Sequence, residues 1–336
     1  MDNQIVVVGI GEVLWDVFPE GKRLGGAPIN FAYHCGQLGA EAYPVSCLGR
    51  DELGAEIRKV LAALNVDLSY VAEDAGHPTG TVQVTLDANG KPFYEICKGV
   101  AWDFLRMSGP ELCESALGAP KETTRRGEAK LGELAEKTAA VCFGSLAQRN
   151  IISRAAIRCF LKKMRPAALR IFDVNVRQTF YSKEIIEESL ELSNILKLSD
   201  EELPVLAELF GLFGSVQDQL VALLDQFGLR LIAYTRGADG SLLVAPDEMN
   251  EHLGCPVEVV DSVGAGDSFT AALCMGLLKE KPLSEINDHA NRVAAFVCSQ
   301  TGATPVLQQG ILDKMIKNSE AGWPEGTAMG RSGMAE

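Results

Sequence analysis

The chain has few basic residues for its number of acidic ones. Among its 336 residues, 45 are Asp or Glu and 31 are Lys or Arg, which gives a formal net charge of −14. Nucleic acids and anionic membranes are bound by basic surfaces, so this balance argues against both as partners. Chemistry on a small molecule is the better expectation.

The sequence also lacks the patterns of a disulfide-bonded, zinc-binding or membrane protein. None of the nine cysteines forms a C-x-x-C pair, and most of them lie in apolar runs, so we interpret them as reduced core thiols. No apolar run is long enough to span a bilayer, and an apolar strand begins near the N-terminus without a preceding basic region or cleavage site. We expect a cytoplasmic protein.

Short apolar runs predict a buried parallel sheet. The hydrophobic content of 47% allows a large core, and residues 5–9 form the continuous apolar run of a strand that is buried on both faces. Similar runs alternate with helical stretches along the chain, which predicts βαβ units. The further predicted parallel strands cover residues 139–143, 169–173, 194–198 and 229–235. The expected fold class is α/β, without a composition break that would indicate a second large domain.

The most informative stretch is DSVGAGDSFTAAL at residues 261–273. The small residues Gly264, Ala265 and Gly266 let backbone N–H groups converge where an apolar helix begins. Unpaired N–H groups and the positive end of the helix dipole together favour a bound anion or a developing negative charge. Asp267 stands at the same helix start, where it could act as the base in phosphoryl transfer. The alternative is a tight glycine turn with Asp267 as a helix cap.

This stretch resembles the C-terminal signature of the ribokinase-like, or PfkB, family of sugar kinases, D-T-x-G-A-G-D, with Ser262 in place of Thr. The other half of the resemblance is LGGAPIN, which follows a strand containing an Asp and opens a helix predicted over about residues 28–38. In that family the Asp, the glycine pair and the Asn hydrogen-bond sugar hydroxyls. The resemblance carries these roles to Asp16, Gly25, Gly26 and Asn30. An ordinary strand residue and a helix cap are the alternatives.

Three predicted strand ends resemble further family motifs, and ligands of open α/β sheets lie beyond such ends. DVNVR is similar to the D-x-N-x-R of bacterial fructokinases and 2-keto-3-deoxygluconate kinases, which places Arg177 near phosphates or a substrate carboxylate, with an ordinary salt bridge equally open. KLSDEE resembles K-x-N-x-x-E with Ser in place of Asn, and its Glu would orient magnesium-bound water. TRGADG resembles T-x-G-x-x-G, with a plain turn as the alternative. The nucleotide-binding residues that the resemblance implies are Lys197, Glu202, Thr235, Gly237, Gly240 and Asn291, the last in an apolar helix over residues 290–299.

The resemblance also implies cofactors. ATP would be the phosphoryl donor and would require Mg²⁺. A monovalent cation, K⁺, is expected on the backbone carbonyls of Asp261 and Val263 together with the turn at Gly302.

A small β lid is implied over residues 12–24 and 80–98, with a hairpin turn at DANG. Its apolar residues at alternate positions predict an exposed apolar face, and hence a homodimer that covers this face. These residues are Val13, Trp15, Val82 and Val84. The charged segment 106–137 is predicted to be a solvated surface element without chemistry.

These observations predict a ribokinase-like kinase domain over residues 1–318, with a doubly wound, mainly parallel sheet flanked by helices, and a disordered tail over residues 319–336. The proposed reaction transfers the γ-phosphoryl group of ATP to a sugar hydroxyl. The segments GEVLWD, AWD and FGSLAQR look most like bacterial fructokinases, which favours D-fructose as the substrate. The alternatives are 2-keto-3-deoxygluconate or another PfkB substrate, and a catalytically silent sugar-binding protein.

Overall fold

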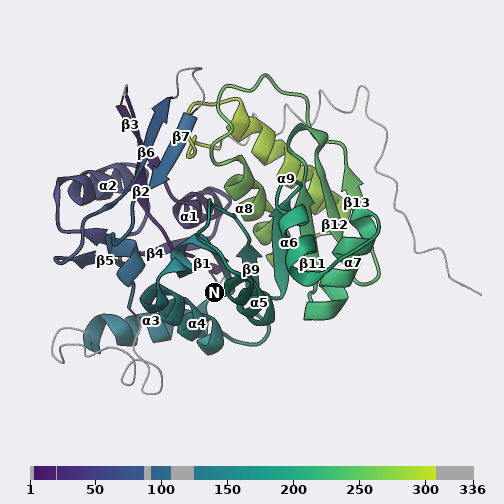
Figure 1. Cartoon of the computed structure of the whole chain (residues 1–336), viewed down its shortest axis with the longest axis horizontal. Helices are drawn as coiled ribbons and strands as arrows, with labels where there is room; N and C mark the ends of the chain where they lie inside the picture. Colours follow the sequence, from purple (N-terminus) through teal and green to yellow (C-terminus); the bar gives the residue numbers. More distant parts are fainter. Residues whose placement is uncertain (1–3, 20, 87–91, 107–124, 308–336) are drawn as a thin grey trace, which may run out of the picture. The chain divides into compact units, whose positions relative to one another are not determined.

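The computed structural model describes residues 4–19, 21–86, 92–106 and 125–307. The chain divides into two compact units (Figure 1). Unit 1 consists of Met1–Ala168 with the short segment Arg177–Tyr181, and unit 2 consists of Leu169–Val176 with Ser182–Glu336. The predicted hairpin turn at DANG and the predicted tail lie outside the described residues.

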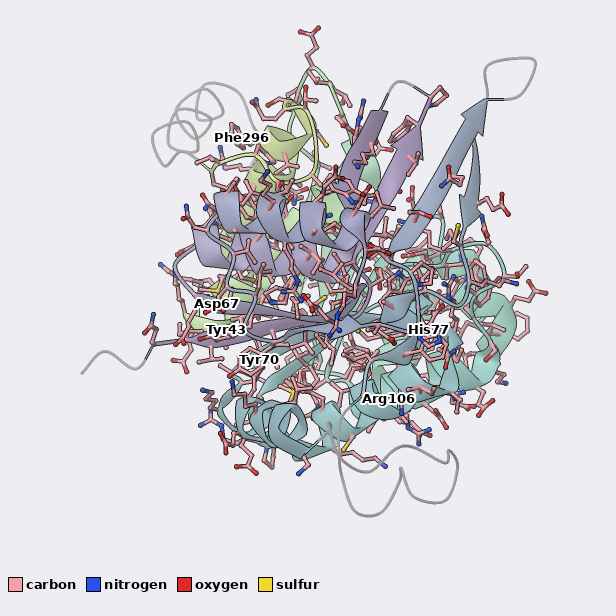
Figure 2. All side chains as sticks on the ribbon, turned by 90° about the vertical axis from the view of Figure 1, so that its left-hand side faces the viewer. Tyr43, Asp67, Tyr70, His77, Arg106 and Phe296 are labelled. Carbon is pink, nitrogen blue, oxygen red and sulfur yellow. The ribbon has the colours of Figure 1, made fainter. Side chains whose placement is uncertain are left out.

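Unit 1 contains four parallel strands in the order β8-β1-β4-β5. Their bounds are Ala140–Gly144 for β8, Val6–Ile10 for β1, Glu41–Gly49 for β4 and Val71–Asp74 for β5. Every residue of β1 and β8 is buried, which confirms the prediction of strands with two covered faces. Near the pair of β4 and β5, the rings of Tyr43 in β4 and Tyr70 just before β5 pack edge to face with centroids 5.0 Å apart (Figure 2).

The helices of unit 1 are α1 (Ala27–Gln37), α2 (Glu52–Ala63), α3 (Arg125–Lys137) and α4 (Ile151–Lys163), with the 3₁₀ turns η1 (Ala101–Phe104) and η2 (Leu146–Arg149). Helix α1 has Pro28 in its first turn, as predicted. Gly9 is required beside it, because a Cβ there would lie 2.0 Å from the Pro28 carbonyl oxygen. The Gly9-x-Gly11 pair therefore admits the start of α1.

Helix α3 corrects the prediction that residues 106–137 are only a solvated surface element. Leu131, Leu134 and Ala135 are buried, while Glu133 and Glu136 are exposed, as in an amphipathic helix. The high charge of this segment hid an apolar stripe at helical spacing. Residues 107–124 lie outside the described chain.

A second, small sheet in unit 1 has the strand order β3-β2-β6-β7, with bounds Gly21–Gly25, Leu14–Phe18, Gly80–Leu86 and Pro92–Ile96. The two segments predicted to form the lid therefore pair with each other. Their closure over a ligand remains a prediction.

The predicted exposed apolar face of this sheet is wrong. Val13 and Trp15 are 0% and 5% exposed, they belong to a core cluster with Ile57 of α2, and the Trp15 indole donates to the Leu53 carbonyl at 3.1 Å. Val82 is also buried, but it pairs with Asp16 in register and so lies on the opposite face from Trp15. The alternating apolar residues that the structure describes therefore lie on two different faces of the sheet, and those on both faces are buried. This removes the reason for predicting a homodimer.

Unit 2 contains the parallel strands β9 (Leu169–Asp173), β10 (Ile195–Ser199) and β11 (Leu231–Thr235), followed by the antiparallel strands β12 (Ser241–Val244) and β13 (Met249–His252). Its helices are α5 (Lys183–Leu192), α6 (Leu203–Phe210), α7 (Val216–Phe227), α8 (Ala265–Leu278) and α9 (Leu283–Cys298), with the 3₁₀ turn η3 (Gly237–Asp239). Helix α9 begins seven residues before the predicted start at 290. Both units are thus mainly parallel sheets with flanking helices, as the α/β prediction requires. Across the described residues, no helix is long and apolar enough to cross a membrane.

Candidate active site

In unit 1, Asp16 lies on the small sheet between two strands. It pairs in register with Arg23 of β3 and with Val82 of β6, so these three side chains share one face. Burial raises the pKa of Asp16 from 3.8 to about 6, while the positive charges of Arg177 and Arg23 oppose this change. The carboxylate is therefore partly desolvated and lies in the field of two arginines.

The predicted glycine pair brings the backbone close to this carboxylate. A Cβ on Gly25 would lie 2.5 Å from Oδ2 of Asp16, and one on Gly26 would lie 2.6 Å from the Glu12 carbonyl oxygen. Gly26 has a φ of 122° and is the N-cap of α1, where its carbonyl accepts from the backbone N–H of Asn30 at 3.1 Å. Asn30 is 3% exposed. The glycine pair therefore lies between the Asp16 carboxylate and the first turn of α1, which contains Asn30. The sugar-binding roles of these four residues remain predictions.

The charge of Arg177 acts on Asp16, and the segment Arg177–Tyr181 belongs to unit 1. Two residues beside it, Asn175 and Gln178, have positive φ values of 42° and 50°. The Phe180 N–H donates to the Arg177 carbonyl at 3.0 Å, which closes a tight turn. Positive φ is unfavourable for a residue such as Gln, so the surroundings hold this turn in shape.

In unit 2, the predicted anion site lies at the start of α8. Gly264 is the N-cap with a φ of 81°, and no side chain caps the helix. A Cβ on Gly264 would lie 2.7 Å from the Ala303 carbonyl oxygen, so glycine is needed for both conformation and space. Asp267 lies in the first turn and is half-buried. Gly264, Ala265, Gly266 and Asp267 are therefore placed as the sequence predicted, with the N–H groups of a first helical turn left without a side-chain cap.

A buried ion pair lies beneath this helix start. Lys197 Nζ donates to Asp173 Oδ1 at 3.0 Å, and a Cβ on Gly266 would lie only 3.3 Å from the same Nζ. Burial alone would lower the pKa of Lys197, but the Asp173 and Glu202 carboxylates hold it above its ordinary value. Burial raises the pKa of Asp173 to about 6, against the charge of Lys197. Asp267 acts electrostatically on both members of the pair.

Asp173 is a site residue to which the sequence analysis gave no role of its own. Its Oδ2 lies 3.5 Å from the Thr270 hydroxyl oxygen of α8, which donates to the Gly266 carbonyl at 2.8 Å. The signal was present, because Asp173 is an acidic residue at the end of a buried strand. Asp173 and Lys197 therefore form a buried ion pair next to the first turn of α8.

Glu202 lies near this ion pair, and both of its carboxylate oxygens accept hydrogen bonds from backbone N–H groups. Its Oε1 accepts from the Val176 N–H at 2.9 Å, and its Oε2 accepts from the Ser199 N–H at 2.7 Å. This carboxylate thus joins the ends of two neighbouring strands. Its predicted role toward magnesium-bound water remains a prediction.

The other predicted nucleotide residues surround the β11–β12 turn and α9. Thr235 donates to the Leu198 carbonyl at 3.3 Å, and Gly237 and Gly240 have φ values of 55° and 83°. A Cβ on Gly240 would lie 2.0 Å from the His252 carbonyl oxygen, so this glycine serves the packing of the turn. The Asn291 amide donates to Ser241 Oγ at 2.7 Å and is 8% exposed, which gives Asn291 a packing role in addition to the one predicted.

The segments predicted to hold a monovalent cation are joined by Asp261. Its carboxylate accepts from the Val263 N–H at 3.1 Å and from the Gly302 N–H at 3.2 Å. Within the described ranges, no group of three or more His, Cys, Asp or Glu side chains could hold a metal ion. The cation site on backbone carbonyls remains a prediction.

Comparison with known proteins agrees with this geometry. The model of the pfkB family of carbohydrate kinases matches residues 7–108 and 118–309. Fructokinase of Escherichia coli is 27% identical over 317 residues, which cover 89% of this chain and 94% of that protein. The matches include both signature regions and nearly all of the described residues.

Solved structures share the fold. The crystal structure of an uncharacterized sugar kinase, PH1459, from Pyrococcus horikoshii has a TM-score of 0.71 at 26% identity and covers 94% of this chain and 98% of that one. The same protein has been solved in complex with ATP. Fructokinase from Vibrio cholerae O395, solved with fructose, ADP and calcium ion, has a TM-score of 0.74 at 23% identity, with coverages of 94% and 99%.

Together the fold, the site and the matches define the chain as a sugar phosphotransferase. It belongs to the pfkB family of carbohydrate kinases.

Proposed function

We propose that the protein transfers the γ-phosphoryl group of ATP to a hydroxyl of D-fructose and so forms fructose 6-phosphate. The observation that carries the kinase reaction is the start of α8, where a half-buried Asp267 and an uncapped first turn lie above the Asp173–Lys197 pair. Fructose is supported by the E. coli fructokinase relative, and ATP by the ATP complex of the P. horikoshii kinase.

In this proposal, unit 1 recognises the sugar. Asp16 accepts hydrogen bonds from sugar hydroxyls, and Asn30 adds an amide that can both donate and accept. Gly25 and Gly26 keep the backbone close to the Asp16 carboxylate and the Glu12 carbonyl, since a side chain at either position would collide with these atoms.

Unit 2 supplies the groups for phosphoryl transfer. Asp267 accepts the proton of the attacking hydroxyl, and the backbone N–H groups of the Gly264–Gly266 turn stabilise the charge that develops on the transferred phosphoryl group. Lys197 neutralises the negative charge of Asp173 next to the turn, so the Asp173 carboxylate does not repel the phosphates of the nucleotide.

Mg²⁺ fits this donor set as a companion of the nucleotide. The ion commonly uses one or two carboxylates together with substrate phosphates and water. Asp267 and Glu202 are the carboxylates that would face its water shell, and the bound ion would neutralise phosphate charge. K⁺ fits the Asp261–Gly302 junction, where carbonyl oxygens could coordinate it.

A second candidate substrate is a sugar acid such as 2-keto-3-deoxygluconate. The specific observation in its favour is that Arg177 and Arg23 both act on Asp16, so the sugar-binding face carries positive charge that a neutral sugar does not need.

The deciding experiment measures ADP release with ATP, Mg²⁺ and a panel containing fructose, other hexoses, ribose and 2-keto-3-deoxygluconate. We expect the highest kcat/KM with fructose and no turnover without Mg²⁺. A higher kcat/KM with the sugar acid would move the assignment to the second candidate. Sugar binding by calorimetry without any ADP release would indicate a catalytically silent binding protein.

We also propose that the enzyme acts in the cytoplasm. The interpretation of the cysteines as reduced core thiols supports this statement. The homodimer stays a prediction without support from the described residues, because the apolar lid face from which it was inferred is covered. Light scattering at micromolar concentration tests it, and a monomeric mass would contradict it.

A further inference from the structure

Arg149, at the end of η2, forms a buried ion pair to which no role was given above. Its side chain is 7% exposed, and that of its partner Asp103 is 2% exposed. Arg149 Nε donates to Asp103 Oδ1 at 2.8 Å and Nη2 donates to Oδ2 at 2.9 Å, which is the two-point geometry of a strong arginine–carboxylate pair. Nη2 also donates to the Cys97 carbonyl at 2.5 Å.

The carboxylate that holds Arg149 is itself fixed. Asp103 Oδ2 accepts from the backbone N–H of Gly99 at 2.9 Å and of Val100 at 3.3 Å. The guanidinium plane is therefore set by backbone groups on both sides of the pair. A buried charge with this many partners is costly to move.

This fixed guanidinium lies against two aromatic rings. Its Cζ atom is 4.1 Å from the ring centre of Trp102 and 4.7 Å from that of Phe180, and Lys98 Nζ lies 5.2 Å from the Phe180 ring centre. Trp102 follows β7 in the chain, but Phe180 comes from the five-residue segment Arg177–Tyr181. Cation–π contacts of this kind strengthen when the cation is desolvated, as Arg149 is.

The aromatic layer is on the sugar-binding face of the small sheet. A Cβ on Gly80 would lie 2.2 Å from the Trp102 indole nitrogen, so Trp102 lies on the face toward which Gly80 points. Gly80 and Val82 are two residues apart on β6, and Val82 pairs with Asp16. Residues two apart on a strand share a face, so Trp102 and Asp16 are on the same side of the sheet.

We propose that Arg149 is a positioning residue: held by Asp103 and layered on Trp102, it captures Phe180 and thereby holds the segment Arg177–Tyr181 so that Arg177 acts on Asp16. Phe180 lies three residues after Arg177 in a turn closed by their own hydrogen bond, so fixing the ring fixes the arginine. The role in catalysis rests on the proposed sugar kinase function, because Asp16 is the sugar-binding residue of that proposal.

Two variants remove the contact in different ways. Arg149→Met keeps an apolar chain but loses the cation, and Phe180→Leu keeps an apolar side chain but loses the ring face. Arg58→Met is the control, since Arg58 of the same unit pairs with Glu73 at 3.1 Å and has no cation–π contact with any ring that the structure describes. Thermal melting confirms that each variant is folded before it is assayed.

We expect both variants to raise the KM for the sugar by roughly tenfold, with kcat and the KM for ATP changed less than about threefold, because a charge-assisted contact at the sugar is weakened. Arg177→Met should give the same pattern, and combining it with Phe180→Leu should add little. A sugar KM that stays at the wild-type value in folded Phe180→Leu and Arg149→Met overturns the proposal. So does an equal loss in Arg58→Met.

A second measurement needs no turnover and separates this proposal from the kinase assignment. The titration of Asp16 is followed by NMR of ¹³C-labelled Asp carboxyls, with the signal identified by its loss in Asp16→Asn. Arg177 lowers the pKa of Asp16, and Arg23 is the other charged residue found to act on it within the described chain. We expect the titration midpoint to move upward in Arg149→Met, Phe180→Leu and Arg177→Met, and to stay in place in Arg58→Met. An unchanged midpoint in the first two contradicts the positioning role even if no sugar is turned over.

Discussion

Replacing Asp16 with Asn is expected to stabilise the empty protein at pH 8 while it weakens sugar binding. The carboxylate is partly buried, and this burial raises its pKa from 3.8 to about 6. One pKa unit corresponds to about 1.4 kcal/mol, so an ionised Asp16 costs the folded state up to about 3 kcal/mol. Water reaches part of the side chain and screens some of this cost, so we expect a gain of about 1 to 3 kcal/mol for the variant.

The sign of the pH dependence follows from the raised pKa. Below about pH 4, Asp16 is protonated in both the folded and the unfolded chain, so the cost is absent. Between pH 4 and 6 the unfolded chain loses its proton first, and the wild type loses stability relative to the variant. Above about pH 6 both states are ionised and the difference is complete.

Urea denaturation at a series of pH values measures this difference, with Asp67→Asn as the control, because Asp67 is an exposed carboxylate of the same unit. The sugar KM of Asp16→Asn should rise by roughly tenfold or more at pH 8, since an anionic acceptor becomes a neutral amide. An effect of Asp16→Asn on stability that is the same at pH 5 and pH 8 would refute the reasoning, because Asp16 would then ionise with the same pKa in the folded and the unfolded chain.

Four further outcomes test the site in unit 2. Asp267→Asn should lower kcat by about 10² to 10⁴ with little change in either KM, as measured by ADP release; a kcat within a few-fold of wild type would show that Asp267 is not the base. Lys197→Met should lower the unfolding free energy by about 3 to 5 kcal/mol in urea, because it leaves the Asp173 carboxylate buried without its partner, and adding Asp173→Asn should restore most of that loss. Gly264→Ala should destabilise the protein more than Gly302→Ala, since both have φ near 80° but only the first Cβ would collide, with Ala303; equal melting temperatures would contradict this. Replacing K⁺ with a large organic cation should lower activity without changing the melting temperature, and unchanged activity at saturating ATP would remove the proposed cation site.

The local features of the site could be predicted because short-range chemistry fixes them. Gly264 must adopt positive φ to begin α8, and Pro28 opens α1 after the glycine pair. The strand at 169–173 was predicted with its observed bounds, because β-branched and apolar residues in a short run have few alternatives. These are properties of neighbours in the chain.

The predictions that were wrong depended on contacts between segments that are distant in the sequence. Trp15 and Val82 look equivalent in the sequence, yet the pairing of β2 with β6 places them on opposite faces. The apolar stripe of α3 is hidden by charged neighbours and becomes visible only where Leu134 is buried. Which face of an element is covered depends on the residues packed against it, and these come from distant segments.

The sequence by itself determined the family of this protein and the residues of its two signatures, because glycines, caps and motif spacing act within a few residues. Only the tertiary structure decided which charged side chains lie next to these signature residues. Asp173 and Lys197 are 24 residues apart and meet because β9 and β10 are neighbours in register. Arg149 and Phe180 meet because a five-residue segment folds into unit 1. In such contacts a charged side chain is buried between elements that are distant in the sequence. No local sequence pattern specifies that these elements pair.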